Sequence, residues 1–238
     1  MRGELAEIWV YLATSPLLWL TVTLGAYVAA DAISGRLKRH PLANPVVIAA
    51  AIVVCLLLAT GTDYGTYFDG AQFVHFLLGP ATVALAVPLF RNLRLVRKAL
   101  LPMAAALFAG SLTAMASAVA IAWLLGAPPE IIASLAPKSA TAPIAMELSR
   151  SLGGIASLSA VLVVSTGIIG AVMVTPLMNA LKITDYAARG FAVGVASHGI
   201  GTARAFQVNE IAGTFAGIAM GLNGALTSLL VLAWLAFG

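Results

Sequence analysis

Eight long apolar stretches in this chain of 238 residues indicate that it folds in a lipid bilayer. A helix needs roughly 20 apolar residues to cross a bilayer, and 61% of the side chains are hydrophobic whereas 9% are charged. We therefore expect an all-α integral membrane protein that forms one polytopic domain over residues 1–238, with room for about seven or eight crossings. The stretches are residues 8–30, 46–60, 73–90, 99–125, 130–148, 155–181, 191–206 and 211–237.

Three of these stretches are broken by helix-disrupting residues. The third contains Gly79-Pro80, the fifth contains Pro137-Lys138-Ser139, and the seventh contains Ser197-His198-Gly199. Each break frees polar backbone groups, which hydrocarbon cannot satisfy and which must therefore face protein or a wet cavity. A harmless kink is an equal alternative for any one of them. Together they are typical of the discontinuous or re-entrant helices that build substrate sites in secondary transporters.

Basic residues predict the orientation of the first half of the chain. Clusters at positions 36–39 and 91–98 are expected in the cytoplasm, and the acidic stretch 63–69 is expected outside. The N-terminus is therefore predicted to lie outside, and the chain is predicted to cross the membrane several times.

The orientation of the second half depends on the fifth stretch. If this stretch crosses the membrane, Arg150 and Arg204 lie inside; if it is a re-entrant hairpin, Lys182 and Arg189 lie inside instead. Either arrangement leaves nine basic residues inside and three outside, so charge does not decide between them.

The fourth and eighth stretches carry small residues at every fourth position, which lets helices approach closely. The glycines with this spacing are Gly110, Gly213, Gly217 and Gly221. Just upstream of each stretch lies a broken segment with a Gly-x-x-Thr element, so we expect repeat halves 1–126 and 127–238. The repeat is inverted if the fifth stretch is re-entrant and parallel if it crosses, and we favour the inverted form.

Lys138 is the most informative residue of the sequence. It lies between Pro137 and Pro143, at membrane depth, where a charge costs roughly 3 kcal/mol or more. One interpretation is a lysine that extends to the interface. The other is an ammonium group that, with Ser139, Thr141 and the amides of a half-helix, binds a small carboxylate.

His198 is the second candidate. A lone histidine in an apolar stretch is often only structural, but glycines follow it, so the backbone is expected to open there. We predict that His198, Gly199 and Thr202 complete the substrate site, that Pro80 and Thr82 contribute from the other half, and that the imidazole carries a proton during transport.

The sequence contains no motif of an enzyme, such as HExxH, GxSxG or a Walker loop. Its one cysteine, Cys55, lies in an apolar run and forms no metal or redox motif. We therefore expect no catalytic activity, no cofactor, no metal and no nucleic-acid partner.

Three blocks of sequence, at residues 77–89, 137–145 and 188–205, resemble the signature blocks of the LrgB/CidB family. The resemblance implies a bacterial inner-membrane protein, often paired with a small LrgA/CidA-type membrane partner. Family members were first described as holin-like and antiholin-like modulators of murein hydrolase export and autolysis. The related plastid protein moves glycolate and glycerate, and bacterial relatives are linked to pyruvate uptake.

This sequence departs from the family pattern at two places. Residues 139–143 read Ser-Ala-Thr-Ala-Pro where the family more often has Ser-Val-Thr-Thr-Pro, which removes a hydroxyl group. The stretch 207–211 is less acidic and less glycine-rich than usual.

Two functions follow as hypotheses. The first is a secondary transporter of small monocarboxylates that works by alternating access, with proton coupling through His198. The alternative is a holin-like or antiholin-like membrane protein. Both involve membrane lipid, and a homo-oligomer, most simply a dimer, is expected for either.

Overall fold

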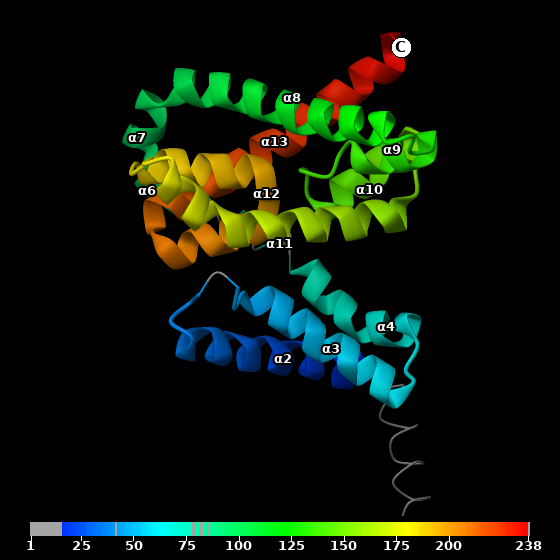
Figure 1. Ribbon diagram of the computed structural model, residues 1–238. Helices are drawn as coiled ribbons and strands as arrows, with labels where there is room; N and C mark the ends of the chain where they lie inside the picture. The colour runs from blue at the N-terminus through cyan, green and yellow to red at the C-terminus, as the bar shows by residue number, and fades with distance from the viewer. Residues whose placement is uncertain (1–15, 41, 78–79, 81–82, 85, 238) are drawn as a thin grey trace, which may run out of the picture. The chain divides into compact units, whose positions relative to one another are not determined.

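The computed structural model describes residues 16–40, 42–77, 80, 83–84 and 86–237. These residues form helices and no strand (Figure 1), which confirms the all-α prediction. They pack as two compact units, Met1–Ala84 and Leu85–Gly238. This division reflects packing, and the repeat halves stay a prediction.

The first unit contains three described helices, α2 (Pro16–Arg36), α3 (Pro45–Thr60) and α4 (Tyr64–Phe76). The chain turns into α3 at Asn44, whose side chain accepts a hydrogen bond from the Val46 amide at 2.8 Å. The break predicted around residue 79 falls partly outside the described residues, which resume in helical form beyond it.

Two side-chain pairs hold the ends of the first unit. The buried Trp19 ring meets the Tyr67 ring edge-on at 5.8 Å between centroids. Beyond the end of α2, Arg39 forms an ion pair with Asp31, and this hydrogen bonding raises the pKa of the guanidinium group.

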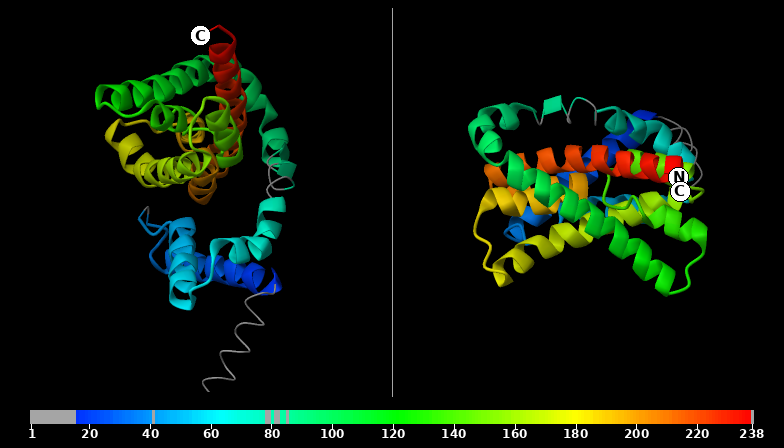
Figure 2. Two further views of the ribbon diagram at one scale, coloured as in Figure 1. Left: turned by 90° about the vertical axis from the view of Figure 1, so that its right-hand side faces the viewer. Right: turned by 90° about the horizontal axis from the view of Figure 1, so that it is seen from above.

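The second unit contains the predicted site and is described in most detail below. Its described helices are α6 (Ala86–Arg91), α7 (Leu93–Lys98), α8 (Leu100–Leu124), α9 (Pro129–Leu135), α10 (Ala142–Ser151), α11 (Ala156–Ala180), α12 (Tyr186–Val208) and α13 (Glu210–Phe237). In both views of Figure 2 they form one bundle. Four described helices are long and apolar enough to cross a membrane: Leu17–Arg36, Leu100–Leu124, Ala156–Ala180 and Glu210–Ala236.

Helix α12 reverses direction at Ser197 and His198, which have non-helical backbone angles. A methyl group added at Gly201 would lie 3.0 Å from the carbonyl oxygen of Val193. Val193 also shares a buried cluster with Ala205, although 12 residues of continuous helix would separate them by about 18 Å. We call α12 the second hairpin, because a first one precedes it in the chain. Its two legs are residues 186–196 and 199–208, on either side of the turn at residues 197–198.

Helices α9 and α10 form the first hairpin, with its tip at residues 137–141. The Ser134 hydroxyl in α9 accepts a hydrogen bond at 2.7 Å from the amide of Ile155, which lies beyond the end of α10. A methyl group added at Gly154 would touch both Ser134 and Ser149. The chain therefore returns, after α10, to the level of α9.

The two hairpins enter the second unit from opposite ends, because α11 connects them and its 25 residues span about 37 Å. The fifth stretch is thus re-entrant rather than crossing. The expectation of seven or eight crossings is too high for the same reason, since two of the eight stretches turn back. Both orientations considered for the sequence place Arg204 opposite Lys182 and Arg189, as a crossing seventh stretch would. The reversal of α12 instead brings Arg204 to the same end as Lys182 and Arg189.

Small residues allow the second hairpin to pack closely on α13. A methyl group at Gly190 or Gly194 would collide with the backbone of Ala212 or Ala216, respectively. Neither glycine belongs to the predicted stripes. Of the predicted positions, Gly110 faces Val195 and Gly213 faces Phe206, Gly217 is half-buried, and Gly221 is exposed with nothing within 4 Å of an added methyl group.

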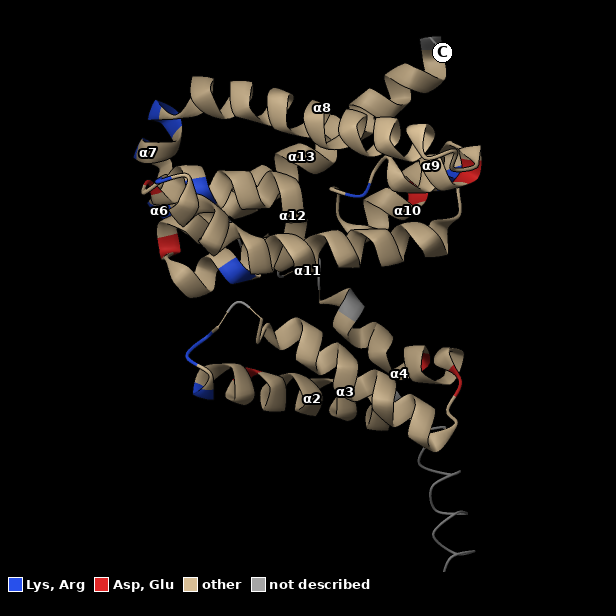
Figure 3. Ribbon diagram, in the orientation of Figure 1, with Lys and Arg blue, Asp and Glu red and all other residues tan. Residues whose placement is uncertain are grey.

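Charge divides the second unit by its ends. In Figure 3 the basic segments gather where α6 and α7 lie. The basic residues at this end are Arg91, Arg94, Arg97, Lys98, Lys182, Arg189 and Arg204, and the acidic Asp185 and Glu210 lie there too. A hydrogen bond of 3.4 Å from Asn92 to Thr214 joins the α6–α7 region to the start of α13. The other end carries Glu130, Glu147 and Arg150.

Candidate functional site

The tips of both hairpins meet on α11 at Val163. Its buried side chain packs with Ala140 and Ala145 of the first hairpin. Its carbonyl oxygen lies 2.9 Å from Nε2 of His198 on the second hairpin. Two of the three breaks predicted from sequence therefore come together about a third of the way along a helix long enough to cross a membrane.

The tip of the first hairpin carries Lys138. This side chain is half-buried, and its Nζ donates to the buried Ser139 hydroxyl at 3.4 Å. Thr141 is half-buried and makes no capping hydrogen bond with its side chain, and α10 begins directly after it. The partial positive charge of a helix N-terminus therefore adds to the ammonium charge at this tip.

The tip of the second hairpin is strained. His198 has φ 40° and ψ −133°, an uncommon conformation for a residue with a side chain. The hydroxyl of Thr202 donates to the His198 carbonyl oxygen, one turn earlier in the returning leg, at 2.8 Å. Gly199 faces Met220 of α13, whose sulfur would lie 3.8 Å from an added methyl group.

Helix α11 makes room for this tip with glycines. A methyl group at Gly167 would lie 2.7 Å from Cε1 of His198, and one at Gly170 would collide with Ser197. Neither Gly167 nor Gly170 is among the glycines predicted from the sequence to pack helices. In the structure, the buried residues of α11 recur at every fourth position: Ser159, Val163, Gly167 and Ala171.

The contact with Val163 defines the protonation of the imidazole. A carbonyl oxygen only accepts hydrogen bonds, so Nε2 of His198 carries the hydrogen and Nδ1 of the neutral ring is an acceptor. Lys138 lies two residues before Ala140, which packs on the side chain of the same Val163. The two tips thus bring two basic groups together.

A third element joins the site through Asn223 of α13. Its amide nitrogen donates to the Ser139 carbonyl oxygen at 2.9 Å, and its amide oxygen accepts a hydrogen bond from Ser111 of α8 at 2.5 Å. The link from Asn223 to the first hairpin depends on the reversal of the chain after α9.

The structure brings five predicted site residues to the tips or directly beside them, namely Lys138, Ser139, Thr141, His198 and Gly199, and Thr202 lies one turn further along the second hairpin. Pro80 occupies an exposed position in the first unit, and Thr82 lies outside the described residues.

The LrgB-like family matches residues 23–237, which is nearly the whole chain. The chain belongs to the LrgB-like family. This confirms the resemblance drawn from the three sequence blocks, two of which form the hairpin tips.

Relatives of this LrgB-like protein match it over almost their full length. An uncharacterized protein of Haemophilus influenzae is 35% identical over 90% of this chain and 92% of its own length. YwbG of Bacillus subtilis, also uncharacterized, is 33% identical over 88% and 92%. Holin-like protein CidB of Staphylococcus epidermidis is 29% identical over 93% and 95%. No solved structure matches the chain.

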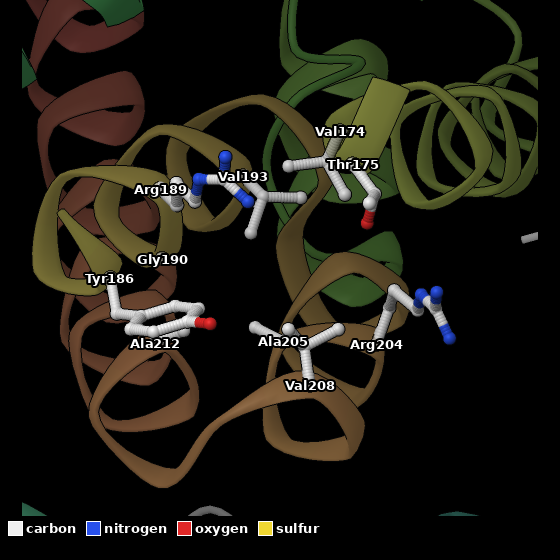
Figure 4. A pocket seen from close by; sticks show the side chains of 10 residues that line it. All are labelled: Val174, Thr175, Tyr186, Arg189, Gly190, Val193, Arg204, Ala205, Val208 and Ala212. Atoms are coloured by element: carbon white, nitrogen blue, oxygen red, sulfur yellow. The ribbon is translucent and has the colours of Figure 1, made fainter. Parts of the chain in front are cut away.

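The LrgB-like protein also has a small cavity between the legs of the second hairpin, away from both tips (Figure 4). Its volume of about 20 Å³ is enough for one water molecule. Arg189 and Tyr186 of one leg line it with the buried Arg204 of the other. The reversal of α12 encloses Arg204 between the two legs.

Proposed function

We propose that this protein is a secondary transporter of small monocarboxylates, such as pyruvate, glycolate or glycerate, and not an enzyme. The observation that carries the proposal is the meeting of two hairpin tips, one with Lys138 and one with His198, on α11. A lysine at membrane depth is costly, and a carboxylate would neutralise it. Hairpins that enter from opposite ends also give each side of the membrane its own access to the tips.

In this proposal, the first hairpin binds the carboxylate. The Lys138 ammonium group supplies the charge, the Ser139 hydroxyl donates a hydrogen bond, and the N-terminus of α10 adds its dipole. The 2-hydroxy or 2-oxo group of the substrate faces the second hairpin, at His198 and Gly199. Movement of one hairpin while the other stays closed would alternate access.

His198 is the proposed proton carrier. Protonation at Nδ1 places a second positive charge near Lys138, so the protonated site binds a carboxylate more tightly. Substrate and proton then enter and leave together, and their charges cancel.

The relatives named Holin-like protein CidB favour a second candidate function. In this reading the protein modulates murein hydrolase export and autolysis, together with a small LrgA/CidA-type membrane partner. A homodimer is expected in either case. A holin-like lesion needs no particular cation at its centre, whereas the transporter depends on Lys138.

Uptake by the purified protein in liposomes separates the two functions. Labelled pyruvate, glycolate and glycerate are offered outside, and a large fluorescent dye is trapped inside. The transporter predicts saturable uptake without dye leakage, and at least a tenfold loss in Lys138→Ala. The matched control is Lys182→Ala, which removes an exposed lysine of the same unit and should transport normally. Leakage of dye, or no saturable uptake of any substrate, would contradict the proposal.

The proton role has its own test in the same liposomes. Wild-type uptake should rise with acidity between about pH 8 and 5, the range in which imidazole ordinarily titrates. His198→Ala should flatten this dependence. An unchanged pH profile in the variant removes His198 as the proton carrier and leaves the carboxylate site in place.

A further inference from the structure

Asn223 lies in the middle of α13, where the first hairpin reaches the core of the second unit. Its side chain is 1% exposed. Both ends of the amide are engaged: the nitrogen donates to the Ser139 carbonyl oxygen, and the oxygen accepts from the Ser111 hydroxyl. These partners fix the orientation of the amide, because a carbonyl oxygen cannot donate.

We infer that Asn223 is the positioning residue for the tip of the first hairpin and that its neutrality keeps the tip selective for anions. This inference rests on the proposed transport function. The carbonyl group that Asn223 holds belongs to Ser139, next to Lys138 in the chain. Displacement of that carbonyl group would move the ammonium group with it.

The surroundings of Asn223 explain why a neutral donor is needed. Helices α8 and α11 contain no titratable side chain, and the one in α13, Glu210, lies in its first turn. In α10, which also packs on α13, Glu147 and Arg150 are exposed and pair with each other at 3.3 Å. Lys138 and His198 are therefore the titratable groups that the two tips bring toward this region. An aspartate at position 223 would be the first carboxylate there, and it would pair with Lys138 in place of the substrate.

The test compares Asn223→Ala and Asn223→Asp with the wild type in pyruvate uptake by liposomes. Asn223→Ala should raise the half-saturating concentration of pyruvate about tenfold, as expected for the loss of the one buried hydrogen bond that holds the tip. Asn223→Asp should nearly abolish uptake at neutral pH. Uptake by this variant should recover under acidic conditions, because a protonated aspartate is neutral and again donates to Ser139. The wild type, measured at each pH, accounts for titration of Lys138 and His198.

Asn179→Asp is the matched control, because it makes the same chemical change at an exposed site beside Arg189. It should transport like the wild type. The inference is overturned if both Asn223 variants keep the wild-type half-saturating concentration. It is also overturned if Asn223→Asp resembles Asn223→Ala at every pH, since that pattern marks a purely structural side chain.

Hydrogen exchange in residues 137–145 keeps the result separate from the proposed function. Positioning predicts faster exchange of this stretch in Asn223→Ala than in the wild type, whether or not pyruvate is transported. Absence of saturable uptake by the wild type would refute the transport proposal, whereas unchanged exchange in the variant would refute the positioning role.

Discussion

One residue, Val163, receives both hairpin tips, the first through its side chain and the second through its carbonyl oxygen. The sequence singled out Lys138 and His198, since a charge and an imidazole stand out among apolar neighbours. Val163 and Gly167 could not be recognised as part of the site in the same way, because an isolated valine or glycine in an apolar helix has no distinctive chemistry. Their role comes from what packs on them.

Gly167→Ala should lower the thermal unfolding midpoint of the purified protein. The added methyl group would press on the His198 ring at 2.7 Å, and overpacking of this kind costs about 1–3 kcal/mol. Alanine is the better helix former by about 1 kcal/mol, so the net effect is smaller than the clash alone.

Gly221→Ala is the control for this substitution, because its methyl group would meet nothing within 4 Å. Its unfolding midpoint should equal or slightly exceed that of the wild type. Equal midpoints for the two variants would mean that the His198 ring moves aside without cost.

For the two hairpins, the sequence predicts where each helix breaks but not the direction of the chain after the break. Proline and glycine mark where helical hydrogen bonds are lost, and the fifth and seventh stretches do break at the predicted residues. The direction of the chain after a break depends on distant partners. For the second hairpin these are Ala212 and Ala216 of α13, which accept the close approach of Gly190 and Gly194.

Buried serine hydroxyls stabilise the base of the first hairpin. Ser134→Ala should destabilise the protein by about 1–3 kcal/mol, because the Ile155 amide loses its acceptor inside the bundle. Thermal unfolding in detergent measures this effect. Ser117→Ala, which alters an exposed serine of α8, should change the midpoint very little, and a comparable shift in both variants would contradict a specific role for Ser134.

The charges of the second unit make sense only when the whole molecule is considered. Once both hairpins turn back, seven basic residues share one end and Arg150 lies at the other. The two orientations considered for the sequence had equal numbers of basic residues inside because both placed Arg204 opposite Lys182 and Arg189, as a crossing seventh stretch would. With the reversal of α12 included, the positive-inside rule favours the end with α6 and α7 for the cytoplasm.

Cysteine labelling in intact cells tests this arrangement in a Cys55→Ser background. Lys182→Cys and Glu210→Cys, which flank the second hairpin, should react from the same side of the membrane. Glu130→Cys and Arg150→Cys, which flank the first hairpin, should react from the opposite side. A membrane-impermeant maleimide should reach Glu130→Cys and Arg150→Cys but not Lys182→Cys and Glu210→Cys. Labelling of Lys182→Cys and Glu210→Cys from different sides would show that the seventh stretch crosses.

The hydrogen bond from Asn223 to Ser139 also joins residues 84 positions apart. During synthesis on the ribosome, the first hairpin therefore leaves the exit tunnel long before its partner on α13 exists. Until α13 is inserted, Lys138 and the unpaired carbonyl group of Ser139 must be solvated by water or lie beside the insertion machinery. The site proposed for transport is thus complete only after α13 has been synthesised, so a nascent chain that lacks α13 is not expected to transport a carboxylate.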